Sequence, residues 1–211
     1  MAMGQVINSA IKRIPAWPLY IVLAVPGIWV FYEAVTNQLG ADPLKALEFQ
    51  LGVYTLRLLV LVLLVTPIRN ITRVSLIKYR RAIGLMVFYY ALAHLMTYLW
   101  LDQQWMWDAI YMDVTKRPYI IVGVLAFTAL LPLVATSNDR AIKRLGAVLW
   151  RQLHRLVYVA AMGGAVHYLL LRKTWQIEPM VYVLIVAILL GYRAFGAIKG
   201  GRGFFLGVLR F

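Results

Sequence analysis

Six long runs of mostly apolar residues divide this chain, and they constrain its fold more than any other feature of the sequence. A helix that crosses a membrane needs about 17–25 such residues. The hydrophobic share of 63% also exceeds the roughly 45–50% of soluble domains. We therefore predict an all-α integral membrane protein, a six-helix transmembrane bundle that forms a single domain over residues 1–211. The expected spans are 17–35, 52–66, 82–100, 119–136, 153–171 and 179–195.

The basic residues between these runs predict the orientation of the bundle. Cytoplasmic loops of membrane proteins carry an excess of Lys and Arg. With the N-terminus inside, the inner segments hold 16 of the 22 Lys and Arg residues, so both termini are expected in the cytoplasm. The first run is too long for a signal peptide and lacks a cleavage site, so it is expected to remain as a helix. The inner set is Lys12, Arg13, Arg69, Arg73, Lys78, Arg80, Arg81, Arg140, Lys143, Arg144, Arg151, Arg155, Arg193, Lys199, Arg202 and Arg210, whereas Lys45, Lys116, Arg117, Arg172 and Lys173 lie outside.

Composition excludes several functions. The chain has no cysteine, which excludes disulfides, thiolate catalysis, iron–sulfur clusters and cysteine-ligated zinc. The net charge of +14 would suggest nucleic acid if it covered one face of a soluble domain. Here the charge lies between apolar runs, so orientation in the membrane explains it better.

All three histidines lie within the predicted spans. His94 is about twelve residues into the third span and His167 about fourteen into the fifth. Both spans run outward, and at 1.5 Å per residue the two imidazoles are expected roughly 18–21 Å from the inner surface, at nearly the same level. His154 lies at the inner end of the fifth span, at the level where the third span has Arg80 and Arg81.

Histidines at matched depth on two helices suit axial ligation of one haem iron from opposite sides. A lone polar residue in a membrane helix also often only hydrogen-bonds a neighbouring helix, and that alternative stays open. Zinc is less favoured because no cysteine or well-placed carboxylate completes a ligand set. His154 and His167 point about 140° apart on an ideal helix, so spacing does not secure a second, inner haem. The segment 163–165 (Gly-Gly-Ala) suits close approach of a haem or ordinary helix packing equally well.

An ordered set of short motifs extends over nearly the whole chain. These are LGADP at 39–43, LLVTPIR at 63–69, RRAIGL at 80–85, HLMTY at 94–98, RPYIIVG at 117–123, RLGAVLWRQLHRLVYV at 144–159 and HYL at 167–169. In this set the chain resembles the haem-binding membrane subunit of the periplasmic methionine-sulfoxide reductase system. This MsrQ or YedZ family belongs to the ferric-reductase-like transmembrane group.

The resemblance implies roles for five residues. His94 and His167 correspond to the ligands of a b-type haem, and His154 corresponds to a further histidine that could serve a second haem. Arg80 stands where larger relatives carry a fourth histidine, and it is expected to pair with a haem propionate or to anchor the inner interface. Arg57 is expected near the outer end of the second span, where it could hold an outer propionate or reach the interface.

The resemblance also implies a function in the bacterial inner membrane. Such a subunit takes electrons from quinol or a cytoplasmic flavin reductase and passes them to a periplasmic molybdenum-cofactor enzyme that reduces protein methionine sulfoxide. No GxGxxG follows a predicted strand here, so the chain is expected to lack its own hydride donor and a complete catalytic site. FMN is implied by the resemblance alone, because no residues identify a site for it.

The predicted outer loop between the third and fourth spans is rich in acidic and aromatic residues. It contains Asp102, Asp108 and Asp113, with Trp105 and Trp107. These residues could dock the partner or form a solvated loop with interfacial tryptophans.

Two other functions are alternatives to electron transfer. A small transporter or channel component would also use six helices, but carboxylates inside the predicted spans are almost absent. A non-redox membrane anchor would use the histidines for packing alone and would be colourless.

Overall fold

A computed structural model describes residues 3–171 and 176–199, and within these ranges every regular element is helical. The chain divides into two compact units, Met1–Ile120 and Ile121–Phe211. Four of the basic residues on which the predicted orientation depends lie outside the described residues: Arg172, Lys173, Arg202 and Arg210. In the described ranges, five helices are long and apolar enough to cross a membrane, which confirms a multi-pass membrane protein.

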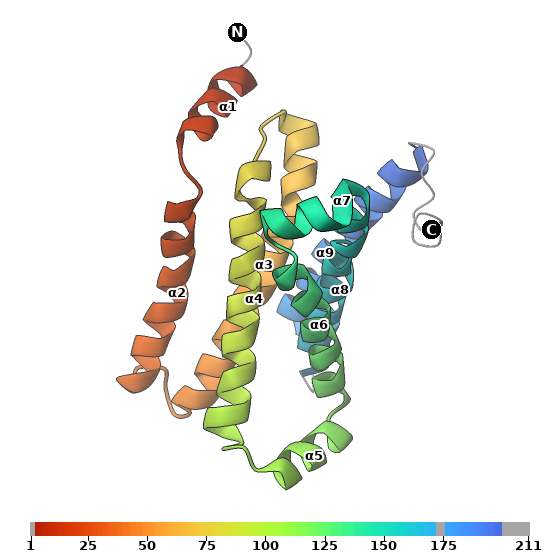
Figure 1. The fold of residues 1–211 in the computed structure, drawn as a ribbon. Helices are drawn as coiled ribbons and strands as arrows, with labels where there is room; N and C mark the ends of the chain where they lie inside the picture. Colours follow the sequence, from red (N-terminus) through yellow and green to blue (C-terminus); the bar gives the residue numbers. More distant parts are fainter. Residues whose placement is uncertain (1–2, 172–175, 200–211) are drawn as a thin grey trace. The chain divides into compact units, whose positions relative to one another are not determined.

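The first unit is built on helices α3 and α4, with α2 packed against both (Figure 1). Its core is aliphatic, and Leu63, Val65 and Val87 are almost completely buried. Its elements are α1 (Met3–Arg13), α2 (Trp17–Val35), α3 (Pro43–Thr72), η1 (Ile77–Tyr79), α4 (Arg80–Met96), the π-helical η2 (Thr97–Asp102) and α5 (Trp107–Lys116).

Helix α3 begins nine residues before the predicted span 52–66. Asp42 caps its N-terminus by accepting a hydrogen bond from Lys45 N at 3.0 Å, and Pro43 occupies the first turn, where proline is well tolerated. The prediction began too late because Lys45 and Glu48 interrupt the apolar run. In the structure these two side chains form an ion pair with each other. Lys45 is therefore part of the span helix and not of an outer loop.

The Tyr90 hydroxyl hydrogen-bonds two backbone groups of α2 next to Pro26. Pro26 lies inside α2, where it has no N–H to donate to the preceding turn. One residue later, Tyr90 Oη accepts from Gly27 N at 2.8 Å and donates to Leu23 O at 2.7 Å. The hydroxyl thus takes the place of the backbone bond between these two groups. A Cβ on Gly27 would lie 2.8 Å from the Tyr90 ring, so only glycine admits it.

Replacing Tyr90 by phenylalanine is expected to destabilise the protein by about 1–3 kcal/mol, because it leaves a backbone donor and acceptor unsatisfied away from water. The free energy of unfolding in a detergent titration followed by circular dichroism measures this effect. Tyr89→Phe is the matched control, because the Tyr89 side chain is 53% exposed. Equal stability of the two variants would contradict the proposed bridging role.

The second unit contains most of α6 (Pro118–Ala135), with α7 (Asp139–Leu153), α8 (Leu156–Leu171) and α9 (Ile177–Lys199). Helix α8 packs against α9. Its 16 residues fall short of the roughly 17–25 of a full span, and it starts three residues after the predicted boundary at 153. Six spans were predicted, and five helices in the described ranges are long and apolar enough to cross a membrane. Helix α8, which corresponds to the remaining predicted span, is shorter.

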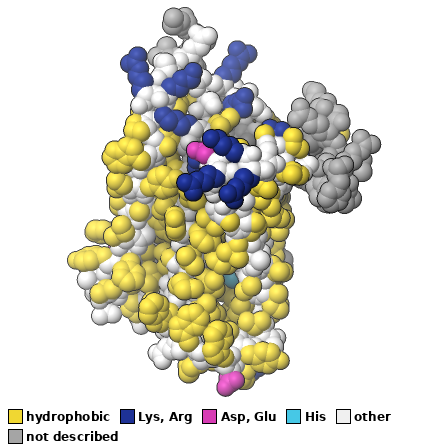
Figure 2. All heavy atoms as spheres, viewed as in Figure 1, with side chains coloured by type: hydrophobic (Ala, Val, Ile, Leu, Met, Phe, Trp, Pro, Cys, Tyr) yellow, Lys and Arg dark blue, Asp and Glu magenta, His cyan; other side chains and the backbone are white. Residues whose placement is uncertain are grey.

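Helix α7 lies across the end of the spanning helices of its own unit (Figure 1). Asn138 caps it by accepting a hydrogen bond from Ala141 N at 2.8 Å, and Gly146 interrupts it with a φ of 74° that favours glycine. Basic side chains gather over this helix (Figure 2), and Val148 and Leu149 are exposed beside them. An amphipathic basic helix of this kind is typical of a membrane interface. Its exposed basic residues are Arg140, Lys143, Arg144 and Arg151.

Candidate functional site

His94 lies near the end of α4 and packs against the first turns of α3. Its Nδ1 is 2.8 Å from the backbone carbonyl oxygen of Glu48. A carbonyl oxygen only accepts, so Nδ1 carries the hydrogen, and in a neutral imidazole Nε2 is then the nitrogen able to bind a metal. Gly52, one turn beyond Glu48, faces the same ring, and a Cβ there would lie 3.3 Å from Nδ1 and Cε1.

His167 has a similar environment in the second unit. It lies four residues before the end of α8 and faces Gly123 of α6. A Cβ on Gly123 would lie 2.7 Å from His167 Nδ1 and 2.9 Å from Cε1, closer than real Cβ atoms approach any neighbour. Each of these two histidines therefore packs its Nδ1 edge on a helical glycine of its own unit. Neither glycine is among the predicted site residues, although a glycine inside a helical pattern often marks close packing.

These environments fit a haem-ligating role for each imidazole. Ligating histidines almost always donate their second ring nitrogen to a carbonyl, carboxylate or water, which fixes the tautomer and the ring orientation. The Glu48 carbonyl does this for His94. The half-buried rings lie on helices that are largely apolar, which suits a macrocycle with an apolar surface.

The small residues before His167 serve helix packing. A Cβ on Gly163 would lie 2.9 Å from the Cβ of Ala126 on α6, and Ala165 is completely buried. Gly163 thus allows α6 and α8 to approach closely, as small residues do in membrane helices. Of the two alternatives for this segment, the contacts at Gly163 favour helix packing.

His154 lies in the turn between α7 and α8, not within a span as predicted. Its ring stacks on Trp150 with centroids 3.8 Å apart. Its Nε2 lies 3.1 Å from Thr136 Oγ1, and Trp150 Nε1 donates to Thr136 O at 2.8 Å. The Thr136 hydroxyl donates its hydrogen to Pro132 O at 2.6 Å. It therefore accepts from His154, and Nε2 carries the hydrogen.

These contacts join the turn before α8 to the end of α6. The predicted angle of about 140° between His154 and His167 assumed one continuous helix. The helix is interrupted at His154 and Arg155, so the ideal-helix angle does not apply. Sequence reasoning missed the roles of Thr136 and Trp150, because no local pattern pairs residues 18 positions apart.

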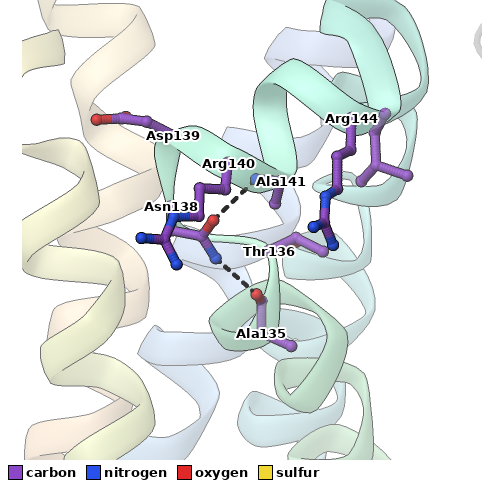
Figure 3. Close-up of a pocket in the computed structure, with 8 residues that line it drawn as sticks. Ala135, Thr136, Asn138, Asp139, Arg140, Ala141 and Arg144 are labelled. Atoms are coloured by element: carbon purple, nitrogen blue, oxygen red, sulfur yellow. Dashed lines mark hydrogen bonds between the residues drawn. The ribbon is translucent and has the colours of Figure 1, made fainter.

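A hollow of about 700 Å³ lies where α6 ends and α7 begins. Figure 3 shows the Arg140 and Arg144 side chains beside it, with Asn138 bonded to Ala135 O and Ala141 N across the turn. Its lining also includes Thr136, the partner of His154. The two guanidinium groups suit an anionic group, but the lining residues include no aromatic ring on which a flavin could stack.

The two predicted arginines occupy different positions in the first unit. Arg80 is half-buried at the first residue of α4. Arg57 lies near the middle of α3, exposed, with its guanidinium 5.7 Å from the centroid of the Tyr54 ring. Because α3 begins at Pro43, well before the predicted boundary, Arg57 lies further from the start of its helix than predicted.

Most of the predicted docking loop forms helix α5. Its three aspartates have different environments. Asp102 pairs with Lys45 at 2.8 Å, and Asp113 pairs with Arg117 at 3.4 Å. The hydrogen bond to Tyr119, with a smaller contribution from Asp113, raises the pKa of the Arg117 guanidinium, so this group stays charged. Asp108 is exposed. Two of the three carboxylates are thus engaged in ion pairs within the chain.

Comparison with known proteins assigns the chain to a family. Residues 51–165 match the family described as "Ferric reductase like transmembrane component". Relatives called "Protein-methionine-sulfoxide reductase heme-binding subunit MsrQ" from Brucella ovis and Brucella canis are 50% identical to it over 177 residues, and one from Brucella melitensis is 49% identical. Each alignment covers 84% of this chain and 80% of the relative. The chain therefore belongs to the MsrQ family of ferric reductase-like transmembrane proteins.

Proposed function

We propose that this protein is the haem-binding electron-transfer subunit of a methionine-sulfoxide reductase system, with His94 and His167 as axial ligands of a b-type haem. The observation that carries the proposal is the hydrogen bond from His94 Nδ1 to Glu48 O, which directs the metal-binding lone pair to Nε2. Family membership and the glycine beside each imidazole support it. When bound, a haem with two imidazole ligands supplies one-electron transfer.

The chain's own residues would orient and shield this group. Glu48 fixes the tautomer of His94, and Gly52 and Gly123 let the two imidazoles pack closely on α3 and α6. The apolar faces of the spans would exclude water from the bound group. Arg57 is the propionate partner that we propose for the outer side, and Arg80 the one for the inner side.

We infer that the electrons come from quinol or a cytoplasmic flavin reductase and go to a periplasmic molybdenum-cofactor enzyme. The relatives' name ties them to protein methionine-sulfoxide reduction. The apolar spans support a place in the bacterial inner membrane.

A second haem on His154 and an FMN group remain proposals from the resemblance. The bond from His154 to Thr136 and the stack on Trp150 give that imidazole a role in joining α6 to the turn before α8. The hollow with Arg140 and Arg144 suits the phosphate of FMN more than its ring. The haem-to-protein ratio in the wild type and in His154→Ala counts the haems directly.

The visible spectrum of the purified protein tests the main proposal. A protein with bis-imidazole haem is expected to be red, and its absorption bands should sharpen when dithionite reduces it. A colourless protein from haem-replete cells would instead support the non-redox anchor.

The proposed orientation, with six spans and both termini in the cytoplasm, can be tested because the chain contains no cysteine. Asp108 and Lys143 are both exposed, and in the proposed orientation single cysteines at these positions would lie on opposite sides of the membrane. A membrane-impermeant maleimide is expected to label Asp108→Cys in spheroplasts but Lys143→Cys only after lysis. The reverse pattern would contradict the orientation.

A further inference from the structure

A cluster of three charged side chains joins the beginning of α3 to the end of η2. Lys45 Nζ lies 2.8 Å from Asp102 Oδ2 and 3.2 Å from Glu48 Oε2, and Gln103 Nε2 donates to the same Asp102 oxygen at 2.7 Å. The two carboxylate side chains are 15% and 19% exposed. These two carboxylates are therefore less screened by salt than surface charges are, whereas the Lys45 side chain is 48% exposed.

Glu48 connects this cluster directly to the imidazole of His94. Its carboxylate pairs with Lys45, while its backbone carbonyl accepts the hydrogen bond of His94 Nδ1. Asp102 lies at the end of the π-helical turn that follows α4, the helix that carries His94. The lysine therefore ties the beginning of α3, against which the imidazole packs, to the π-helical turn that follows the helix carrying the imidazole.

We propose that Lys45 and Asp102 tune the reduction potential of the haem that His94 ligates, in opposite directions. This inference rests on the proposed function. A nearby cation disfavours the more positive, oxidised form of the iron and raises the potential, whereas a nearby anion lowers it. Lys45 and Asp102 are positioning and tuning residues, because they act on the iron site through Glu48 and through space and are not ligands.

A redox titration of the full-length protein in lipid nanodiscs, followed at the reduced haem bands, tests the inference. Lys45→Met removes the cation and is expected to shift the midpoint potential down, and Asp102→Asn removes an anion and is expected to shift it up. Lys45→Arg keeps the charge and should restore the wild-type potential. Asp108→Asn is the matched control, since Asp108 is an exposed carboxylate of the same unit and should shift the potential less than either variant.

Shifts of opposite sign that exceed the control support the inference. Shifts of the same sign, or shifts no larger than that of Asp108→Asn, would overturn it. If Lys45→Met loses its haem, Lys45→Gln is titrated instead, because glutamine can still hydrogen-bond Asp102. A wild-type protein that binds no haem would overturn the proposed function itself, whereas a haem protein with unchanged potentials would overturn only this inference.

Discussion

Alanine in place of His94 or His167 is expected to abolish the bis-imidazole spectrum and most of the haem content. Loss of an outer-shell partner alone typically costs about 10–100-fold in metal affinity, and loss of an axial ligand should cost more. Haem content per protein, measured after purification of each variant by the same procedure, gives the result. The two variants should behave alike, because each leaves the iron with one imidazole.

Chemical rescue separates ligand loss from misfolding. Imidazole added during purification can occupy the space left by the deleted ring and should restore part of the spectrum in both variants. Gly191→Ala is the internal comparison, because its new Cβ would meet nothing within 4 Å and the variant should bind haem like the wild type. A His94→Ala protein with full haem content and an unchanged spectrum would refute the ligand assignment.

Gly123→Ala is expected to have the second large effect, although it adds only one methyl group. The new Cβ would lie 2.7 Å from His167 Nδ1, a distance that forces the imidazole or helix α6 to move. Overpacking of this kind typically costs about 1–3 kcal/mol, and the displaced ring should bind haem poorly. Haem content and thermal stability of the variant measure the two consequences.

Two other glycines calibrate this prediction. Gly52→Ala places its Cβ 3.3 Å from the His94 ring, so a small shift should suffice and the haem should be retained with an altered spectrum. Gly191→Ala in α9 meets nothing within 4 Å and should behave like the wild type. Normal haem content in Gly123→Ala, with Gly191→Ala also normal, would show that the close contact does not position His167.

The length of the apolar runs predicted the long helices well where the run was uninterrupted. Helix α2 has the predicted bounds, and α6 differs from 119–136 by one residue at each end. The prediction was poorer where charges enter a span, as at Lys45, or where a turn interrupts an apolar run, as at His154. Helix α7 could have been predicted from the sequence. Asn138 is a typical N-cap residue, and the residues after it have the amphipathic pattern of an interfacial helix.

The sequence alone determined the membrane class and the candidate ligands, because hydrophobic length, basic loops and the scarcity of histidine are local properties. Family membership then came from motifs in order along the chain. The surroundings of those ligands depended on tertiary structure. The Glu48 carbonyl meets His94 across 46 residues, and the Tyr90 hydroxyl enters α2 across 63. No local pattern encodes such contacts, because they form only when helices pack side by side.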